Sequence, residues 1–83
     1  MYIKYLNNIH NIDNYYSVVK GGIKDNCIHL MKNDSLFLAL EFKDSKIRNV
    51  ILSDIWEEML KKTEFLNIDA NIELYNVSDK YNL

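Results

Sequence analysis

The most reactive side chains in this sequence are Cys27 and His29, two positions apart in the apolar segment CIHLMK. Alternate side chains of a strand project from the same face, so a strand here places the thiol and the imidazole side by side. Such a pair begins a nucleophilic site, or a metal site if His10 adds a ligand. A nucleophile also needs a positioned base, an orienting group and oxyanion donors, and no motif supplies them. We therefore interpret Cys27 as a small core residue and expect no enzymatic activity.

The length and composition are those of one small globular domain. The chain has 83 residues, a hydrophobic fraction of 48% and a net charge of −2, without the basic excess that nucleic-acid binding favours. Its single cysteine allows no internal disulfide and supplies too few thiols for a cysteine-ligated zinc. We expect a single domain over residues 1–83, with no cofactor, no metal and no nucleic-acid partner.

Residue usage and the absence of targeting segments predict a bacterial cytoplasmic protein. Asn, Ile, Lys and Tyr, which all have A/T-rich codons, number eleven, ten, nine and six. This bias indicates a low-GC bacterium or its phage as the source. No apolar run approaches about 18 residues, and the N-terminus lacks a basic-then-apolar leader, so we expect neither membrane association nor export.

The first predicted element is a helix over residues 8–20. Apolar residues recur at spacings of three, four, three and four, at Ile9, Ile12, Tyr16, Val19 and Ile23. This is the period of one helix face. Asn7 or Asn8 can cap its start, and the Gly-Gly pair that follows can end it. The alternative is a strand over 15–20 with a Gly-Gly hairpin turn, because Asn is a poor helix former and the stretch contains β-favouring residues.

A three-stranded antiparallel meander is predicted to follow. Its strands are predicted at residues 27–32, 35–43 and 46–52. They are joined by two turn-prone dipeptides, Asn33-Asp34 and Asp44-Ser45. The short polar side chains of these dipeptides bond to nearby backbone, as turns require. A two-residue second turn sets Glu41 opposite Arg48, and Leu38 opposite Ile51.

The clearest helix signal covers residues 54–66. Asp54 followed by Glu57 resembles a capping box, and the pairs Glu57–Lys61 and Glu58–Lys62 have the favoured i,i+4 order. The predicted buried stripe, with Trp56 at its margin, consists of Ile55, Met59, Leu60, Thr63 and Leu66.

The last predicted element is a strand over 70–77, where ANIELYNV alternates between apolar and polar residues. Together with the 46–52 strand and the helix between them, it makes a right-handed crossover. The predicted fold is an α+β two-layer sandwich: an N-terminal helix, an antiparallel β-meander of three strands, and a final strand after a crossover helix. Residues 78–83 are predicted to form a loose tail.

The stretch FLALEF raises the question of what covers the second face of this sheet. In the predicted register, Leu38 and Leu40 face one way, while the opposite face carries Phe37, Val50 and Leu52. The second face is too apolar to remain in water. Either the 8–20 helix covers it, or Phe37, Val50 and Leu52 form the interface of a homodimer.

The residues best suited to partner binding lie in the last third of the chain. Residues 53–83 contain seven acidic and three basic residues, a balance of −4, which suits a protein partner with a basic surface. Tyr and Trp are enriched where binding energy concentrates. The candidate partner-binding residues are Trp56, Glu57, Glu58, Glu64 and Tyr75.

These features favour a non-enzymatic protein-binding module. Its small size and residue usage indicate a phage or mobile-element inhibitor, of the anti-defence or immunity type, that binds a host protein complex. One alternative is a small self-associating structural or regulatory subunit. Another is an enzyme or nucleotide binder built on Cys27 and His29 across a dimer.

Overall fold

The structure is a computed structural model that describes residues 1–13, 17–21, 24–32 and 35–81. These residues form a small α+β fold with two helices and two three-stranded sheets. In chain order the elements are β1 (Tyr2–Tyr5), β2 (Asn8–Asn11), β3 (Ser17–Lys20), β4 (Cys27–Lys32), β5 (Ser35–Glu41), α1 (Ser45–Leu60), β6 (Phe65–Asn67) and α2 (Ile68–Tyr81).

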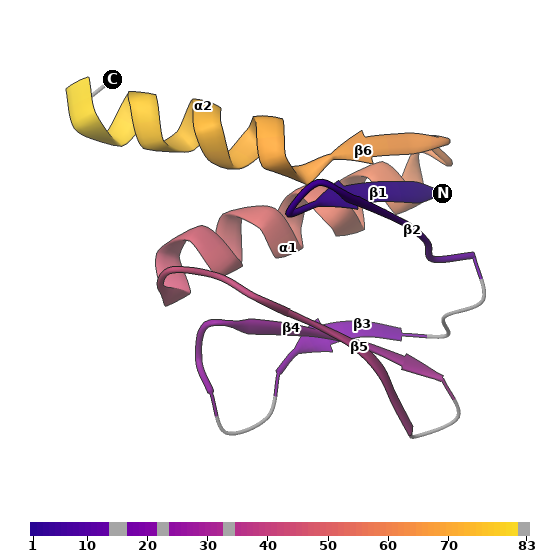
Figure 1. The fold of residues 1–83 in the computed structure, drawn as a ribbon. Coiled ribbons are helices and arrows are strands. Elements are labelled where there is room, and N and C mark those ends of the chain that lie inside the picture. Colours follow the sequence, from indigo (N-terminus) through magenta and orange to yellow (C-terminus); the bar gives the residue numbers. More distant parts are fainter. Residues whose placement is uncertain (14–16, 22–23, 33–34, 82–83) are drawn as a thin grey trace.

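The two sheets lie on opposite sides of α1. In the β1 sheet, β1 is antiparallel to β2 and parallel to β6, whereas in the β4 sheet, β4 is antiparallel to both β3 and β5. Figure 1 shows α1 between the sheets, with α2 extending from β6 in the layer of the β1 sheet. The fold therefore has three layers, not two. Among the described residues, the largest fully buried side chains are Ile3, Ile28, Leu30, Leu40, Ile51, Leu52, Ile55 and Ile68.

The predicted N-terminal helix is wrong, because β2 and β3 occupy much of residues 8–20. β1 and β2 are joined by Leu6 and Asn7, which have φ values of 50° and 61°, the sign that a type I′ hairpin turn requires. The Asp69 carboxylate accepts hydrogen bonds from both turn N–H groups, at 2.7 and 3.0 Å. A residue more than 60 positions away therefore holds this turn, which no local periodicity could reveal.

The alternative strand over 15–20 agrees with β3, which covers Ser17–Lys20. β3 pairs with β4, so that Val18 lies opposite Leu30 and Val19 opposite His29. Residues 14–16 and 22–23 lie outside the described residues. They include Gly22, the second glycine of the pair that was predicted to end the helix. Pairing with β4 outweighed the helical spacing of the apolar residues.

The predicted strand over 46–52 is also wrong, because α1 begins at Ser45. Asp44 is its N-cap: the backbone there is extended, and the side chain accepts the N–H of Ile47 at 2.9 Å. The same dipeptide is typical of a hairpin turn, since an Asp side chain can bond nearby backbone in either setting.

One stripe of α1 faces the core. Ile47, Ile51 and Ile55 recur every four residues and are buried. Arg48 is buried beside them and donates from Nη1 to the Cys27 carbonyl at 3.2 Å. The predicted cross-strand pairs of Glu41 with Arg48 and of Leu38 with Ile51 therefore do not form.

α1 ends well before residue 66, through a Schellman-type motif. Lys62 has a φ of 59°, and the N–H groups of Lys62 and Thr63 donate to the carbonyls of Met59 and Glu58, each at 3.1 Å. The chain then leaves the helix axis and enters β6.

The predicted final strand over 70–77 is a helix, α2. The Asn67 side chain accepts the N–H of Ala70 at 3.0 Å and so caps the helix start. Ile72 and Tyr75 pack against the core one turn apart, a spacing that the apolar–polar alternation concealed. No crossover between strands 46–52 and 70–77 forms.

α2 extends to Tyr81, and residues 82–83 lie outside the described residues. The domain prediction placed a loose tail from residue 78 onward, whereas α2 continues four residues into that segment.

The sheet face predicted to carry Phe37, Val50 and Leu52 does not form, because the last two residues lie on α1. Leu52 is buried, and Val50 is 37% exposed. In β5 the register passes from Leu38 opposite Leu30 to Leu36 opposite Met31, so the Phe37 backbone is the extra residue of a β-bulge. The side chain of Phe37 lies outside the described residues.

Tyr5 joins the two sheets at one end of the molecule. Its hydroxyl donates to the Glu41 carbonyl, and its ring centroid lies 5.1 Å from that of Phe42. Burial raises the pKa of the Tyr5 hydroxyl above its usual 10.0, and the Asp69 and Glu41 carboxylates add to the shift. The phenol therefore remains a donor across the neutral range.

Asp54, predicted to cap a helix, lies inside α1 and joins it to α2. Its Oδ2 accepts a hydrogen bond from Nδ2 of Asn71 at 3.1 Å. Burial raises the pKa of the Asp54 carboxyl above its usual 3.8, against the opposing effect of the Asn71 hydrogen bond, and Glu57 and Glu58 raise it further. The ionised carboxylate is therefore less favourable in the folded protein than in the unfolded chain.

Asp54→Asn is expected to raise the free energy of unfolding near pH 7, because the amide keeps an acceptor for Asn71 without the charge. The destabilisation by Asp54 is complete above its raised folded-state pKa and vanishes below 3.8, where both states are protonated. Urea unfolding of both proteins near pH 7 and at about pH 3 measures the effect. An equal gain at both pH values would contradict this account.

Candidate functional site

The predicted partner-binding residues fall into two places. Trp56, Glu57 and Glu58 lie on the last turns of α1, and Glu64 lies in the connection to β6. Tyr75 lies on α2, where it packs half-buried against the core. The candidate site is therefore the last two turns of α1 with residues 61–64, which we call the α1 end surface.

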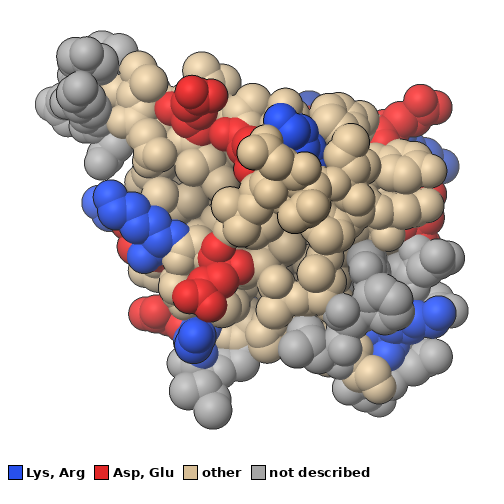
Figure 2. Space-filling model, in the orientation of Figure 1, with Lys and Arg blue, Asp and Glu red and all other residues tan. Residues whose placement is uncertain are grey.

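The α1 end surface is less acidic than the sequence predicted. Lys61 Nζ lies 3.3 Å from a carboxylate oxygen of Glu57 and 3.7 Å from one of Glu58. The hydrogen bond to Glu57 and the charges of both carboxylates raise the pKa of the Lys61 ammonium. With Lys62 and Glu64 included, three carboxylates face two ammonium groups, a balance of −1. Figure 2 likewise shows acidic and basic side chains interspersed on the face it displays.

Apolar side chains are the more distinctive part of this surface. Trp56 is 45% exposed, Met59 39% and Leu60 86%. Met59 and Leu60 were predicted to be buried, because the stripe was drawn on a helix that began at residue 54. Since α1 begins at Ser45 and buries Ile51 and Ile55, its C-terminal turns extend past the core.

Trp56 is held in place although much of its ring is exposed. Its Nε1 donates to the Val18 carbonyl of β3 at 2.8 Å. This bond satisfies the indole N–H and fixes the side chain, so the exposed part of the ring is a pre-oriented apolar surface.

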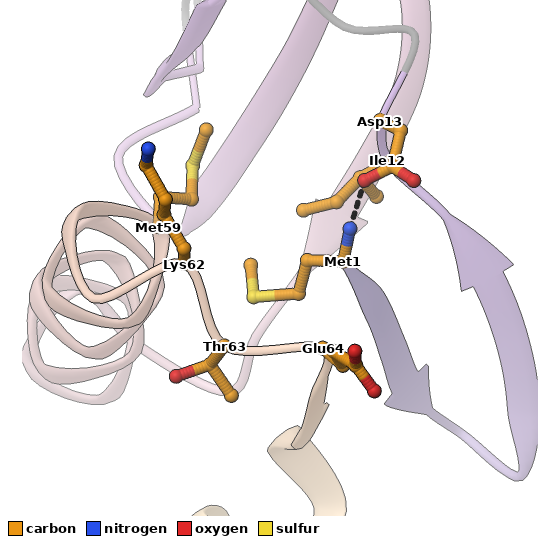
Figure 3. A pocket seen from close by; sticks show the side chains of 7 residues that line it. All are labelled: Met1, Ile12, Asp13, Met59, Lys62, Thr63 and Glu64. Atoms are coloured by element: carbon orange, nitrogen blue, oxygen red, sulfur yellow. Dashed lines mark hydrogen bonds and ion pairs between the residues drawn. The ribbon is translucent and has the colours of Figure 1, made fainter.

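A hollow of about 320 Å³ opens beside the α1 end surface (Figure 3). It is lined by side chains from the N-terminus, from the residues after β2 and from the end of α1, namely Met1, Ile12, Asp13, Met59, Lys62, Thr63 and Glu64. A second hollow of about 470 Å³ shares Met1, Asp13 and Glu64 and adds Tyr2 and Phe65. The two hollows therefore adjoin across Met1.

Some of the charged groups at these hollows form ion pairs within the described part of the chain, and others do not. The Met1 ammonium forms an ion pair with Asp13. Among the described residues, Glu64 has no ion-pair partner. Lys62, on the rim, holds the left-handed backbone that ends α1. Glu64 is thus the carboxylate that can receive a cation from outside. Sequence spacing could not reveal this site, because its walls come from segments about 50 residues apart.

Cys27 and His29 lie on one face of β4, as alternation predicted, and both border Gly21. A Cβ at Gly21 would lie 2.6 Å from Cδ2 of His29 and 2.8 Å from Cβ of Cys27. Cys27 is buried, and its Sγ lies 3.6 Å from Oδ1 of Asn26. His10 lies on β2, in the other sheet. Over the described ranges, no group of three or more His, Cys, Asp or Glu side chains is placed to hold a metal ion.

Comparison with known protein families, with curated proteins and with solved structures found no match to this chain. Neither α1 nor α2 has the length and apolar composition needed to cross a bilayer.

Proposed function

We propose that this protein is a non-enzymatic protein-binding module whose partner docks on the α1 end surface. The observation that carries the proposal is the exposure of Trp56, Met59 and Leu60 beside the 320 Å³ hollow. Covering a large apolar side chain contributes up to about 1.5–3 kcal/mol, so three neighbouring ones offer a substantial driving force for association.

The rigidity of Trp56 supports the same proposal. Binding energy concentrates in aromatic anchors at the centre of an interface. A side chain already fixed by its hydrogen bond to Val18 loses little conformational entropy when a partner covers it. Trp56 is therefore the proposed anchor, and Met59 and Leu60 are the apolar surroundings that exclude water.

The partner that suits this surface presents an apolar side chain together with a cation. The apolar group would enter between Met1, Ile12 and Met59, while a lysine or arginine would reach Glu64. The sequence led us to expect a partner with a basic surface. The proposal now requires one cationic side chain of the partner, in contact with the Glu64 carboxylate. The more specific form of the proposal, a phage or mobile-element inhibitor that binds a host protein complex, is supported by residue usage and small size.

The test begins with a pull-down from a bacterial host lysate and continues with calorimetry on the recovered partner. Trp56→Ala and Leu60→Lys are each expected to weaken binding by about tenfold or more, since loss of a central anchor costs over 1 kcal/mol. Glu57→Lys combined with Glu58→Lys is expected to slow association, an effect that added salt reduces.

Val50→Ala is the matched control, because Val50 lies on α1 with comparable exposure but outside the α1 end surface. It is expected to bind like the wild type. Leu60→Lys is not expected to disturb folding, because this side chain is almost fully exposed. A loss of binding in this variant therefore reports on the interface itself. Undiminished affinity in both Trp56→Ala and Leu60→Lys would overturn the proposed site, and catalytic turnover by the purified protein would overturn the proposed class.

A further inference from the structure

The three methionines and the single cysteine of this chain differ in their exposure to solvent. Met59, on the last turn of α1, is 39% exposed. The side chain of Met1 is only 6% exposed, although it lines the same hollow, and Met31 of β4 is half-buried. Cys27 is buried. Met59 is therefore the sulfur-containing residue that an oxidant in solution reaches most readily.

Met59 also lies at the centre of the surface that the proposed partner covers. Its side chain lines the 320 Å³ hollow together with Met1 and Ile12, as Figure 3 shows. It follows Trp56 by three positions, so the two side chains are neighbours on the surface of α1. A thioether is apolar and polarisable, which suits contact with an aromatic ring and with an apolar group of the partner. A chemical change at this sulfur therefore alters the proposed contact directly.

We propose that Met59 is a site of reversible oxidation by hydrogen peroxide, and that its sulfoxide weakens binding of the partner. This inference rests on the proposed function, because the partner is the molecule that covers Met59. A lone pair of the sulfur attacks one peroxide oxygen, an S–O bond forms and the O–O bond breaks. The sulfur loses two electrons to the peroxide. The hydroxide that leaves takes the proton from the transferred oxygen, so the products are the sulfoxide and water.

The sulfoxide is expected to alter binding without unfolding the protein. Its oxygen is a strong hydrogen-bond acceptor, which water satisfies while Met59 is exposed. An apolar partner group in the hollow would displace this water and leave the oxygen without its donor, which opposes binding. The free energy of unfolding should change little, because Met59 lies outside the buried stripe of α1.

Mild treatment with hydrogen peroxide, followed by mass spectrometry of proteolytic peptides, tests the site on the free protein. Met59 is expected to gain one oxygen atom at least about threefold faster than Met1 or Met31. Met59→Leu, which keeps the side-chain volume but removes the sulfur, should abolish this first oxidation. Met31→Leu is the matched control and should leave it unchanged. Faster oxidation of Met1, Met31 or Cys27 would overturn the assignment of the site.

Calorimetry with the partner recovered by pull-down tests the effect on binding. The protein is oxidised at Met59, and the peroxide is removed before the partner is added. Affinity is expected to fall at least about tenfold and to return after treatment with the two methionine sulfoxide reductases, one for each epimer. Met59→Leu should bind like the wild type before and after peroxide treatment.

Unchanged affinity of the oxidised wild type, or an equal loss in peroxide-treated Met59→Leu, would overturn the role of Met59. The proposed function fails on a different result, namely undiminished binding by Trp56→Ala and Leu60→Lys. The two failures are therefore distinguishable.

Discussion

Ile51→Ala is expected to lower the free energy of unfolding by about 2–5 kcal/mol, the usual cost of removing a fully buried branched side chain. Ile51 is completely buried on the stripe of α1 that lies between the two sheets. Because both sheets pack toward this helix, neither can close the resulting cavity without losing contacts of its own. Urea unfolding, followed by circular dichroism, gives the change directly.

Leu60→Ala is the control for this prediction, because it removes a similar side chain from the exposed end of the same helix. It is expected to change the unfolding free energy by less than about 0.5 kcal/mol. If the two variants lost similar amounts of stability, the burial of the α1 stripe between two sheets would be incorrect.

Asp69→Ala is expected to destabilise the protein by about 2 kcal/mol, through loss of two charge-assisted hydrogen bonds. The Asp69 carboxylate accepts the N–H groups of Leu6 and Asn7, whose left-handed backbone is unfavourable for residues with a side chain. Its removal therefore leaves a strained turn without its partner. Hydrogen exchange of the Leu6 and Asn7 amides should accelerate together with the loss of stability.

Asn7→Gly separates the two causes of the destabilisation in Asp69→Ala, namely the lost hydrogen bonds and the strain of the left-handed turn. Glycine adopts positive φ without strain, so Asn7→Gly is expected to recover part of the stability lost in Asp69→Ala. A double-mutant cycle measures the coupling between the two positions. An Asp69→Ala protein as stable as the wild type would show that the turn needs no support from α2.

The part of the fold that sequence reasoning predicted best is the pair of strands β4 and β5. Both are apolar runs, separated by the polar residues 33–34, and they were predicted at 27–32 and 35–43. Their pairing is local, so the information that determines it lies within about 15 residues of sequence. The overlap of the predicted 54–66 helix with α1 has the same local origin in the Glu–Lys pairs.

The errors arose where the same residues suit two structures. Asp44 and Asn67 are true helix caps, whereas Asp54 is an interior residue of α1, yet each precedes an apolar stretch. What selects Asp44 over Asp54 as the cap of α1 is the burial of the helix stripe that includes Ile47 and Ile51, a consequence of the whole fold. Likewise, the 3,4 spacing from Ile9 to Val19 suited a helix, but β1 and β4 offered hydrogen-bonded neighbours.

The candidate site could be predicted in its helical part only. Trp56, Glu57 and Glu58 were placed on a helix, and all three lie on α1. The exposure of Met59 and Leu60 depended on where the helix begins, and the hollow beside them depended on Met1 and Ile12 arriving from the other end of the chain. Local spacing carries no information on either point.

The parallel pairing of β1 with β6 has a consequence for how the chain matures during synthesis. Tyr2 lies opposite Phe65, so β1 is synthesised more than 60 residues before β6, the strand that completes its sheet. At about 5–20 residues per second, the ribosome needs roughly 3–13 seconds to cover that interval. During this time β3, β4 and β5 can pair with one another, but the β1–β2 hairpin lacks both its third strand and the Asp69 carboxylate. Until β6 is made, one edge of β1 has no hydrogen-bonded neighbour, and an unpaired strand edge exposes a nascent chain to aggregation.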